Sequence, residues 1–395
     1  MHYNLRLFWR TFYRSFFDSK NTPARLTRKR LTFLLLFYTV WPAGTLLYRI
    51  LFLLDDIFYP GHKTQPVEKP LFIIGNLRSG STFLHRLLSR DETFTSLTTW
   101  DIYLAPTIIQ KKITQFVSRL DKKLGGHLHR LLYAFDRRTL GKIKIHPISF
   151  FQPEEDENIL LHAWDSFWVT FLFPIMDEFP NYQHFDEALS PEHKRKIMAF
   201  YKSMLQRHLY ATGKKYYVAK APAFSAKIET LVEFFPDARI IYLARNPLDM
   251  LPSTVSWINY SRRVFTDPGE GYFYLDEITD LTQHWYRHPL RYLDSHPSPR
   301  YLILKYDDLI QRPEHVIRNF YEQFGYPDKP GLEKIVDEAV KETLAHRSDH
   351  SYSYEEMGFT REQIVEIYAD IFERFDFDER EHELAGARTK VSAFD

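Results

Sequence analysis

A short apolar run followed by a loop with two glycines constrains this chain more than any other feature of its sequence. Residues 71–74 (LFII) have the continuous apolar character of a strand that is buried on both faces. Residues 75–82 (GNLRSGST) follow, and a helix is expected to continue to about residue 90. In this order of elements, backbone N–H groups and a helix N-terminus converge on a phosphate group. The sequence therefore predicts a phosphate-binding loop.

The residue types in the loop indicate which phosphate it prefers. The glycine spacing matches the P-loop of nucleotide-binding proteins, GxxxxGK[ST], but Ser81 stands where the P-loop has lysine. Without that lysine, a β,γ-phosphate pair with Mg²⁺ loses a main cationic contact. Arg78 instead offers a planar fork suited to a 5′-phosphate and a bridging oxygen. Ser79, Gly80 and Thr82 complete the candidate loop, and a turn without a ligand is the alternative.

Three more residues are expected at the same edge of a sheet. Arg245 and Lys220 each stand at the end of a predicted strand, and Ser253 lies about two helical turns beyond Arg245. Ligands bind at the carboxyl ends of parallel strands, so Arg245 with Ser253 can hold a second phosphate. Alternatively, Arg245 caps a neighbouring helix and Lys220 is a surface lysine. Strands and helices alternate here, which predicts an α/β fold with a parallel sheet flanked by helices: strands at 216–219, 239–244 and 301–305, helices at 225–235, 247–260 and 313–324.

Taken in order, these segments resemble the sulfotransferase superfamily that uses 3′-phosphoadenosine 5′-phosphosulfate (PAPS), and within it the bacterial-type branch. The resemblance implies that Arg78 through Thr82 bind the 5′-phosphosulfate and that Arg245 and Ser253 bind the 3′-phosphate. It also implies that Lys220 lies near the transferring sulfuryl group, that adenosine 3′,5′-bisphosphate is the product, and that no metal is needed. The matching segments span residues 70–325: IIGNLRSGSTFLHRLLSRD, TTWDIYLAP, HPISFFQPEEDENILL, YVAKAPAF, FFPDARIIYLARNPLDMLPS and ILKYDDLIQRPEHVIRNFYEQFG.

The general base cannot be transferred from the superfamily. Tyrosylprotein sulfotransferases have a catalytic glutamate where this chain has Thr98 and Thr99. The chain also lacks the C-terminal Arg-Lys-Gly motif of the cytosolic enzymes, and it has an arginine in place of their loop lysine. An acceptor hydroxyl still has to lose its proton, and a nearby carboxylate can accept it. We rank Glu155 and Glu154 above Asp101 as candidates.

The two glutamates belong to an unusual acidic run. Residues 154–157 are four consecutive acids, which repel one another unless basic groups lie close. This favours a position facing a site lined by Arg78 and Lys220. The alternative is a solvated helix N-terminus, because Pro153 precedes the run. His146 is a further candidate for the base.

The N-terminal region has the features of a membrane attachment. The first residues form an amphipathic pattern, which predicts an interfacial helix or, alternatively, a helix on the protein's own core: Leu5, Phe8, Trp9, Phe12 and Phe16 oppose Arg6, Arg10 and Arg14. Residues 31–48 then carry no formal charge, but Pro42 and Gly44 interrupt them. A tilted span, a re-entrant hairpin and a docking helix are all compatible with this length. Basic residues flank the segment at both ends, and a hairpin would return the chain to its starting face; both favour attachment from the cytoplasmic side, with the catalytic domain in the cytoplasm.

The sequence thus predicts three parts: a membrane-associated segment (1–60), a sulfotransferase domain (61–380) and a polar tail (381–395). A net charge of +1 gives no reason to expect nucleic acid as a partner. The absence of cysteine fits a reducing compartment. The expected acceptor is a hydroxyl of a lipid, glycolipid or glycan, with a membrane lipid surface as a second partner. The rival hypotheses are a P-loop nucleotide kinase or NTPase, and a membrane-tethered scaffold without activity.

Overall fold

The sheet has five parallel strands in the order β2-β3-β1-β4-β5, so the loop-bearing strand β1 lies at its centre. We analysed a computed structural model that describes residues 2–139, 149–175, 179–327 and 354–378, together with Glu333, Val336, Asp337 and Lys341. The predicted α/β class and four of the strands are confirmed, whereas β2 was not predicted because it is only two residues long. The strands are β1 (Leu71–Gly75), β2 (Phe94–Thr95), β3 (Tyr216–Lys220), β4 (Arg239–Ala244) and β5 (Tyr301–Lys305).

Alternate side chains of β1 point into two separate hydrophobic cores, as the period of a strand requires. Leu71 and Ile73 join the core under α3 (Ser81–Leu88) and α15 (Pro313–Phe324). Phe72 and Ile74 join a larger core on the other face. Both faces of the sheet are therefore covered, which explains why the strand is a continuous apolar run.

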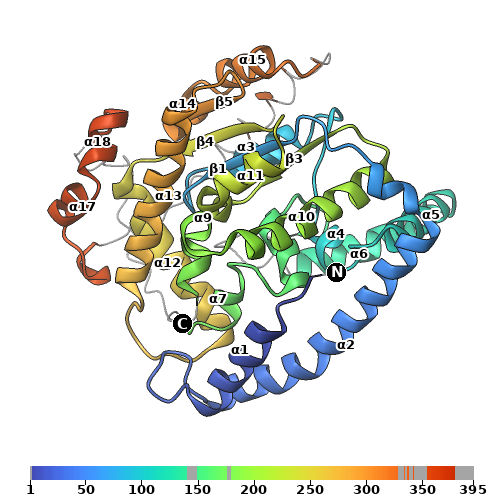
Figure 1. Ribbon diagram of the computed structural model, residues 1–395, viewed down its shortest axis with the longest axis horizontal. Helices are drawn as coiled ribbons and strands as arrows, with labels where there is room; N and C mark the ends of the chain where they lie inside the picture. The colour runs from blue at the N-terminus through green and yellow to red at the C-terminus, as the bar shows by residue number, and fades with distance from the viewer. Residues whose placement is uncertain are drawn as a thin grey trace.

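Helices of the larger core cover the second face of the sheet, and the N-terminal helices pack outside them (Figure 1). The helix expected over 225–235 begins as a 3₁₀ turn, η5 (Pro222–Lys227), and continues as α11 (Ile228–Phe234). The other helices here are η3 (Asp156–Ala163), α7 (Val169–Leu172), α8 (Pro180–Gln183), α9 (Phe185–Ala188), α10 (Pro191–Thr212), α12 (Pro247–Phe265), α13 (Leu275–Ser295), α17 (Arg361–Ile367) and α18 (Ala369–Phe375); η1 (Pro60–Thr64), α14 (Tyr306–Gln311) and η6 (Glu355–Met357) are short connections.

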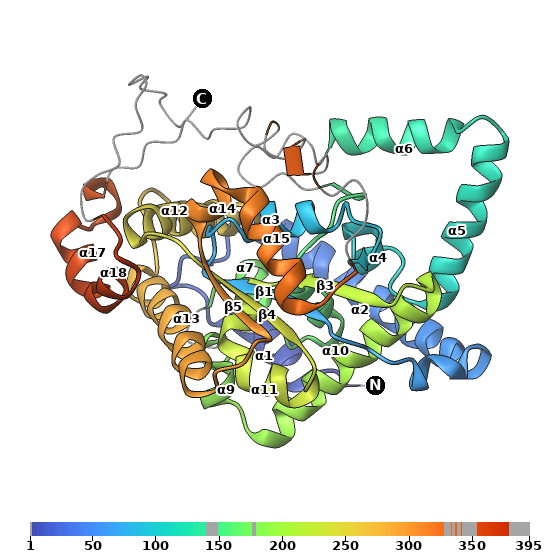
Figure 2. The ribbon, with the colours of Figure 1, turned by 90° about the horizontal axis from the view of Figure 1, so that it is seen from above.

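The region after β2 forms an arm that projects from the body of the molecule (Figure 2). It consists of α5 (Ile108–Lys123) and α6 (His127–Arg138), which Gly125 and Gly126 separate, while the preceding α4 (Thr99–Tyr103) lies against the body. Large apolar side chains on this arm are exposed, among them Ile113, Phe116, Leu120, Leu124, Leu131 and Phe135. The arm thus offers apolar surface that none of the described parts of the chain covers.

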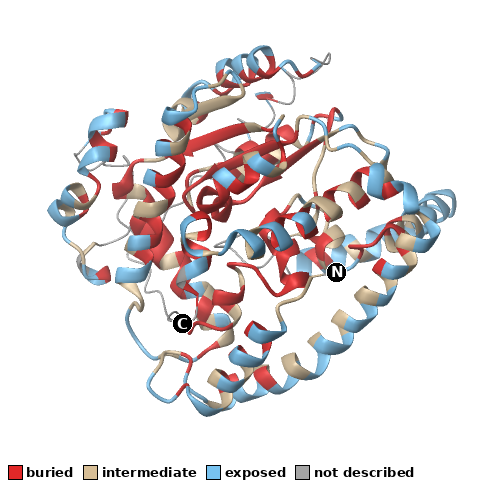
Figure 3. Ribbon diagram, viewed as in Figure 1, coloured by how far each residue is buried: buried red, intermediate tan, exposed pale blue. Residues whose placement is uncertain are grey.

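The N-terminal region contains one long helix rather than a hairpin. Helix α2 (Arg28–Phe58) runs without a break through Pro42, so the re-entrant hairpin is wrong. Its length and apolar composition would allow it to cross a membrane, and only 11% of its most apolar 18-residue window is buried. Figure 3 shows α2 largely exposed beside the buried sheet.

The two ends of the N-terminal region are fixed to the rest of the chain. In α1 (Leu5–Phe17), Phe8 packs against Tyr38 and Trp164, whereas Trp9 remains exposed. At the other end, the Asp55 carboxylate accepts hydrogen bonds from the first backbone N–H groups of α5, with N···O distances of 2.8 and 3.0 Å. The predicted interfacial helix therefore buries part of its apolar face on the protein and exposes the rest.

Candidate functional site

Two glycines let the predicted loop fold tightly around the end of β1. Gly75 has φ +141°, and a Cβ atom there would collide with the carbonyl oxygen of Leu243. Gly80 has φ +85°, and a Cβ atom there would collide with the ring of Tyr306. Glycine is therefore the residue that both positions require, for space as well as for backbone conformation.

Side chains from distant parts of the chain hold the loop in shape. Ser225 Oγ accepts a hydrogen bond from Gly75 N and donates one to Gly75 O, both at 3.0 Å. Within the loop, Ser79 Oγ donates to the carbonyl of Asn76 at 2.5 Å, and Asn76 Nδ2 donates to Thr282 O at 3.1 Å. The sequence did not single out Ser225 or Asn76, because both act through contacts with residues far along the chain.

The loop presents open hydrogen-bond donors at the start of α3. No residue that the structure describes accepts a hydrogen bond from the backbone N–H groups of Ser79, Gly80, Ser81 or Thr82. Several N–H groups directed from a loop and a helix N-terminus favour an anion. The loop is thus suited to a phosphate or sulfate group.

Arg78, Ser253 and Arg245 form one cluster beside the loop. Arg78 Nε donates a hydrogen bond to Ser253 Oγ at 3.0 Å, and Arg245 Nη1 donates to the carbonyl of Arg78 at 2.7 Å. The Arg245 guanidinium also lies 4.7 Å from the centre of the Tyr306 ring. Arg245 therefore contacts the loop rather than the end of a neighbouring helix. The two predicted anion sites are adjacent.

Lys220 is buried next to the same edge of the sheet. Lys220 is 1% exposed, and its Nζ lies 2.5 Å from Glu155 Oε1. Lys220 pairs in register with Ile73 of β1, two residues before the loop. The prediction that Lys220 lies near the loop agrees with this position, and the alternative of a surface lysine is wrong.

The acidic run is buried rather than solvated, because a separate partner compensates each of three acids. Glu155 pairs with Lys220, as described above. Tyr201 and Tyr217 donate hydrogen bonds to Asp156 Oδ2 at 2.6 and 2.7 Å. Glu157 forms a fully buried ion pair with Lys227. The alternative of a solvated helix N-terminus is therefore wrong.

Two of the candidate bases differ in their surroundings from Glu155. Glu154 is also buried, and its Oε1 accepts a hydrogen bond from the backbone N–H of Glu155 at 2.9 Å. Asp101 belongs to the capping box at the start of α4 and forms an ion pair with Lys111. Burial raises the pKa of Asp101, but Lys111, His208 and the hydrogen bonds outweigh it and bring the pKa down to about 2. So weak a base is poorly suited to accept a proton. His146 lies outside the described residues.

Asp156 is expected to make folding stability depend on pH. Burial raises the pKa of Asp156 from 3.8 to about 7, although the two tyrosine hydrogen bonds oppose the shift. A carboxyl with a raised pKa stabilises the fold most below about pH 4, and this contribution is lost as the pH rises to about 7. Asp156→Asn cannot ionise. As the pH rises through this window, we expect its free energy of unfolding to increase relative to that of the natural protein by up to about 1.4 kcal/mol per pH unit. Urea unfolding of both proteins at several pH values measures the difference; parallel curves would contradict it.

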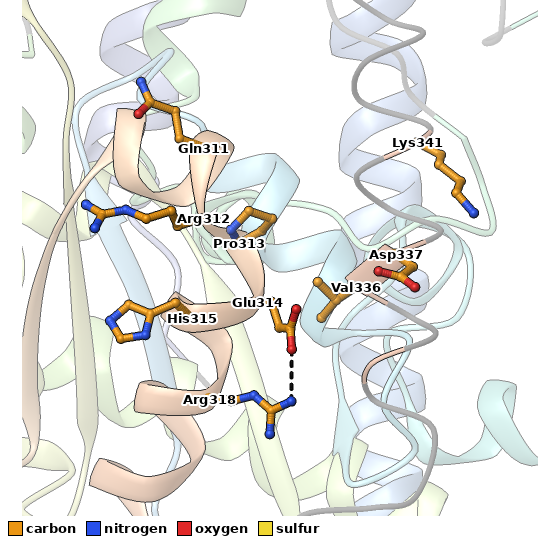
Figure 4. A pocket seen from close by; sticks show the side chains of 9 residues that line it. All are labelled: Gln311, Arg312, Pro313, Glu314, His315, Arg318, Val336, Asp337 and Lys341. Atoms are coloured by element: carbon orange, nitrogen blue, oxygen red, sulfur yellow. Dashed lines mark hydrogen bonds and ion pairs between the residues drawn. The ribbon is translucent and has the colours of Figure 1, made fainter.

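A concavity of about 580 Å³ lies elsewhere, between the start of α15 and the residues Val336, Asp337 and Lys341 (Figure 4). Charged side chains of both signs line it, and Glu314 pairs with Arg318 at its wall, with 2.8 Å between the nitrogen and the oxygen. No residue of the loop contributes to this concavity. It is therefore separate from the candidate site.

Comparisons with known proteins agree on a family. A family model described as "Sulfotransferase family" matches residues 70–330. Omega-hydroxy-beta-dihydromenaquinone-9 sulfotransferase Stf3 from Mycobacterium tuberculosis is 26% identical over 343 residues, which are 83% of this chain and 80% of that protein. The protein of the same name from Mycobacterium bovis matches to the same extent.

Two solved structures share the fold. Sulfotransferase STF9 from Mycobacterium avium superposes with a TM-score of 0.70 at 20% identity, covering 96% of this chain and 98% of that one. Sulfotransferase STF1 from Mycobacterium tuberculosis has a TM-score of 0.67 at 19% identity, covering 93% and 92% of the two chains. Both alignments cover more than nine-tenths of this chain, so the likeness extends beyond the sheet.

Proposed function

This chain belongs to the sulfotransferase family, and we propose that it transfers a sulfuryl group from PAPS to a hydroxyl group of an amphiphilic acceptor. Membership of the family supports a transferase enzyme. The observation that carries the finer proposal is the arrangement at the carboxyl edge of the sheet: Lys220, which pairs with Glu155, ends β3, and the bonded residues Arg78 and Arg245 follow the neighbouring strands β1 and β4. Two anion-binding positions next to a buried acid suit a donor with two phosphates and an acceptor that must lose a proton.

In this proposal, the loop holds the donor and the second arginine completes its site. Backbone N–H groups of Ser79 to Thr82, together with Arg78, bind the 5′-phosphosulfate. Arg245 and Ser253 bind the 3′-phosphate. Because these groups come from the ends of neighbouring strands, they are already in place before the donor arrives, and such preorganised charge is what a loose sulfuryl-transfer transition state needs.

The proposed reaction is one in-line exchange of bonds at sulfur. The acceptor oxygen bonds to sulfur as the bond between sulfur and the bridging oxygen breaks, and adenosine 3′,5′-bisphosphate leaves. The hydroxyl proton passes to Glu155. Lys220 holds Oε1 of this carboxylate at 2.5 Å, so Oε2 is the oxygen available to the acceptor. The ammonium of Lys220 also stabilises negative charge on the sulfuryl group and on the leaving oxygen.

Exposed apolar helices support an amphiphilic acceptor reached at a membrane. The mycobacterial relative Stf3 is named as a sulfotransferase of omega-hydroxy-beta-dihydromenaquinone-9, a hydroxylated lipid. In this chain, α2 exposes large apolar side chains although both of its ends contact the rest of the chain, and the arm of α5 and α6 exposes further ones. We place the chain at the cytoplasmic face of a membrane, where basic residues of the first thirty positions would meet anionic headgroups.

Differential scanning fluorimetry tests the donor assignment. A ligand that binds only the folded protein raises the melting temperature. We expect adenosine 3′,5′-bisphosphate to raise it without added metal, and ATP–Mg²⁺ to have little effect because the loop lacks the P-loop lysine. Stabilisation by ATP–Mg²⁺ alone would instead indicate a kinase or NTPase. No response to either ligand would favour a scaffold without activity.

Mass spectrometry of lipid extracts tests the acceptor. Cells that express the protein should contain a lipid that has gained one sulfate, and cells that express an Arg78→Ala variant should not. If sulfation appears only on water-soluble glycans, the amphiphilic acceptor is ruled out while the donor assignment stands.

A further inference from the structure

A group of histidines and acids lies where α13 packs against α9, apart from the transfer site. His184 and Glu187 come from the chain at α8 and α9, whereas His284 and His288 stand one helical turn apart on α13. The ring centres of His184 and His284 are 4.0 Å apart, and those of His284 and His288 are 4.9 Å apart. Helices α9 and α13 lie side by side in both views of the ribbon (Figures 1 and 2).

His284 is mostly enclosed, yet it makes no hydrogen bond with any residue that the structure describes. Its side chain is 9% exposed, and its Nε2 is buried with no partner in the part of the chain that the structure describes. The nearest acid, Glu187, places Oε2 3.9 Å from His284 Nδ1, which is beyond hydrogen-bond reach. A buried polar group left unsatisfied costs about 1–3 kcal/mol. Nδ1, the nitrogen that faces Glu187, also makes no hydrogen bond with a residue that the structure describes, so it is the atom open to a ligand.

His184 is oriented so that one of its nitrogens faces the same point. Its Nε2 lies 2.6 Å from Asp280 Oδ2, and this carboxylate holds the proton on Nε2. Nδ1 therefore presents its lone pair, 3.9 Å from Glu187 Oε2. A carboxylate that fixes the second nitrogen of a histidine is the usual support for a metal ligand.

Glu187 supplies a carboxylate oxygen between the two rings. Its Oε1 is bound by Arg291, with an N···O distance of 2.6 Å, while Oε2 is equally far from Nδ1 of His184 and Nδ1 of His284. Burial, together with the neighbouring His184 and His288, lowers the pKa of His284 to about 4.

We propose that His184, Glu187 and His284 bind a divalent transition-metal ion of the Zn²⁺ type. One ligand atom from each residue lies within 4.8 Å of the others. Two imidazole nitrogens and one carboxylate oxygen are ligands that Zn²⁺ accepts, whereas Mg²⁺ prefers oxygen alone. Ligands of a tetrahedral zinc ion are about 3.3 Å apart, so the 3.9 Å separations need only a small contraction. Glu187, which is 48% exposed, has room to make it.

Such an ion would stabilise the packing of helices on one face of the sheet and would not take part in sulfuryl transfer. Asp186, next to Glu187, accepts hydrogen bonds from the backbone N–H groups of Glu229 and Thr230 at the start of α11, with N···O distances of 2.9 and 3.2 Å. It also pairs with His288, 3.1 Å away. A metal on Glu187 would therefore connect α9, α11 and α13. None of the loop residues belongs to this group.

Calorimetric titration tests the metal site directly. The protein, without a histidine tag and stripped with a chelator, is titrated with ZnCl₂ and with MgCl₂. We expect one Zn²⁺ per chain, a higher melting temperature with Zn²⁺, and neither effect with Mg²⁺. Loss of a ligand in His284→Ala or Glu187→Gln should weaken binding more than ten-fold, and Asp280→Asn should weaken it about 10- to 100-fold.

A histidine on the same helix provides the matched control. His296 caps the end of α13, is exposed and lies outside the group, so His296→Ala should bind Zn²⁺ as the natural protein does. Because Glu187 is half exposed, Glu187→Gln keeps the test valid even if His284→Ala does not fold. The proposal fails if the natural protein shows no saturable Zn²⁺ binding, or if Glu187→Gln and Asp280→Asn bind as tightly as His296→Ala.

Discussion

Replacing Arg78 or Arg245 by alanine is expected to abolish the binding of adenosine 3′,5′-bisphosphate while the protein still folds. Arg245 donates to the backbone of Arg78, and Arg78 donates to Ser253, so each guanidinium is positioned before the ligand binds. Removing one partner of a desolvated, hydrogen-bonded charge pair costs about 2–5 kcal/mol. At 1.4 kcal/mol per ten-fold change, each variant should lose at least about 30-fold in affinity.

The control for the two single variants is an arginine of β4 that does not belong to the candidate donor site. Arg239 stands at the opposite end of β4 from Arg245, and its Nη1 donates to the carbonyl of Asp237. Arg239→Ala should therefore bind the bisphosphate as the natural protein does. Calorimetric titration gives the affinities, and circular dichroism shows whether each variant is folded. Unchanged affinity in both Arg78→Ala and Arg245→Ala would refute the donor site.

Much of the sheet was predictable because parallel strands that are buried on both faces leave a plain signal. β4 and β5 begin and end where the apolar runs predicted, and β1 and β3 differ by one residue. Short or mixed elements left no such signal. β2 has two residues, and α10 buries side chains on several sides, which blurs its periodicity. The helix expected at 225–235 starts as a 3₁₀ turn because Pro222 directs the chain there.

The candidate site was predictable where residues follow strands, and unpredictable where they meet across the fold. Arg78, Lys220 and Arg245 were found from their places at strand ends, since the ends of parallel strands meet at one edge. Tyr306, under the Arg245 guanidinium, and Ser225, beside Gly75, were missed because nothing local marks them. The burial of the acidic run was uncertain from sequence for the same reason: its partners lie at least 45 residues away.

In the N-terminal region, a single proline was not enough to predict where a helix breaks. Pro42 suggested a hairpin, because proline removes a backbone donor and strains a helix. The helix nevertheless continues from Arg28 to Phe58. Its two ends are fixed by contacts with the rest of the chain: Arg30 donates to the carbonyl of Leu172 at 2.7 Å, and Asp55 caps α5. Long-range contacts at both ends thus outweigh a local cost in the middle.

Replacing Glu155 by glutamine is expected to lower turnover by about 10²–10⁴-fold, the usual contribution of a general base. The amide keeps the size of the side chain, and its oxygen still accepts a hydrogen bond from Lys220, but it cannot take up a proton. Donor affinity should therefore stay unchanged while kcat falls. If Glu155 acts as the base, the acidic limb of the kcat–pH profile should disappear in the variant; a residue that only positions Lys220 would leave that limb in place.

Variants of the neighbouring acids distinguish a residue that accepts the proton from one that only contributes negative charge. Asp156 points to Tyr201 and Tyr217 instead of Lys220, so Asp156→Asn should retain kcat within a few-fold. Glu154→Gln should also lower turnover if the two glutamates act together, because the Glu154 side chain holds the backbone of Glu155. Full activity in both glutamine variants would move the role to Asp101, despite its ion pair with Lys111. Because a buried charge left alone destabilises a protein by about 3–5 kcal/mol, the melting temperature of Glu155→Gln must be measured too. A loss of turnover without a loss of stability is the result that assigns the proton to Glu155.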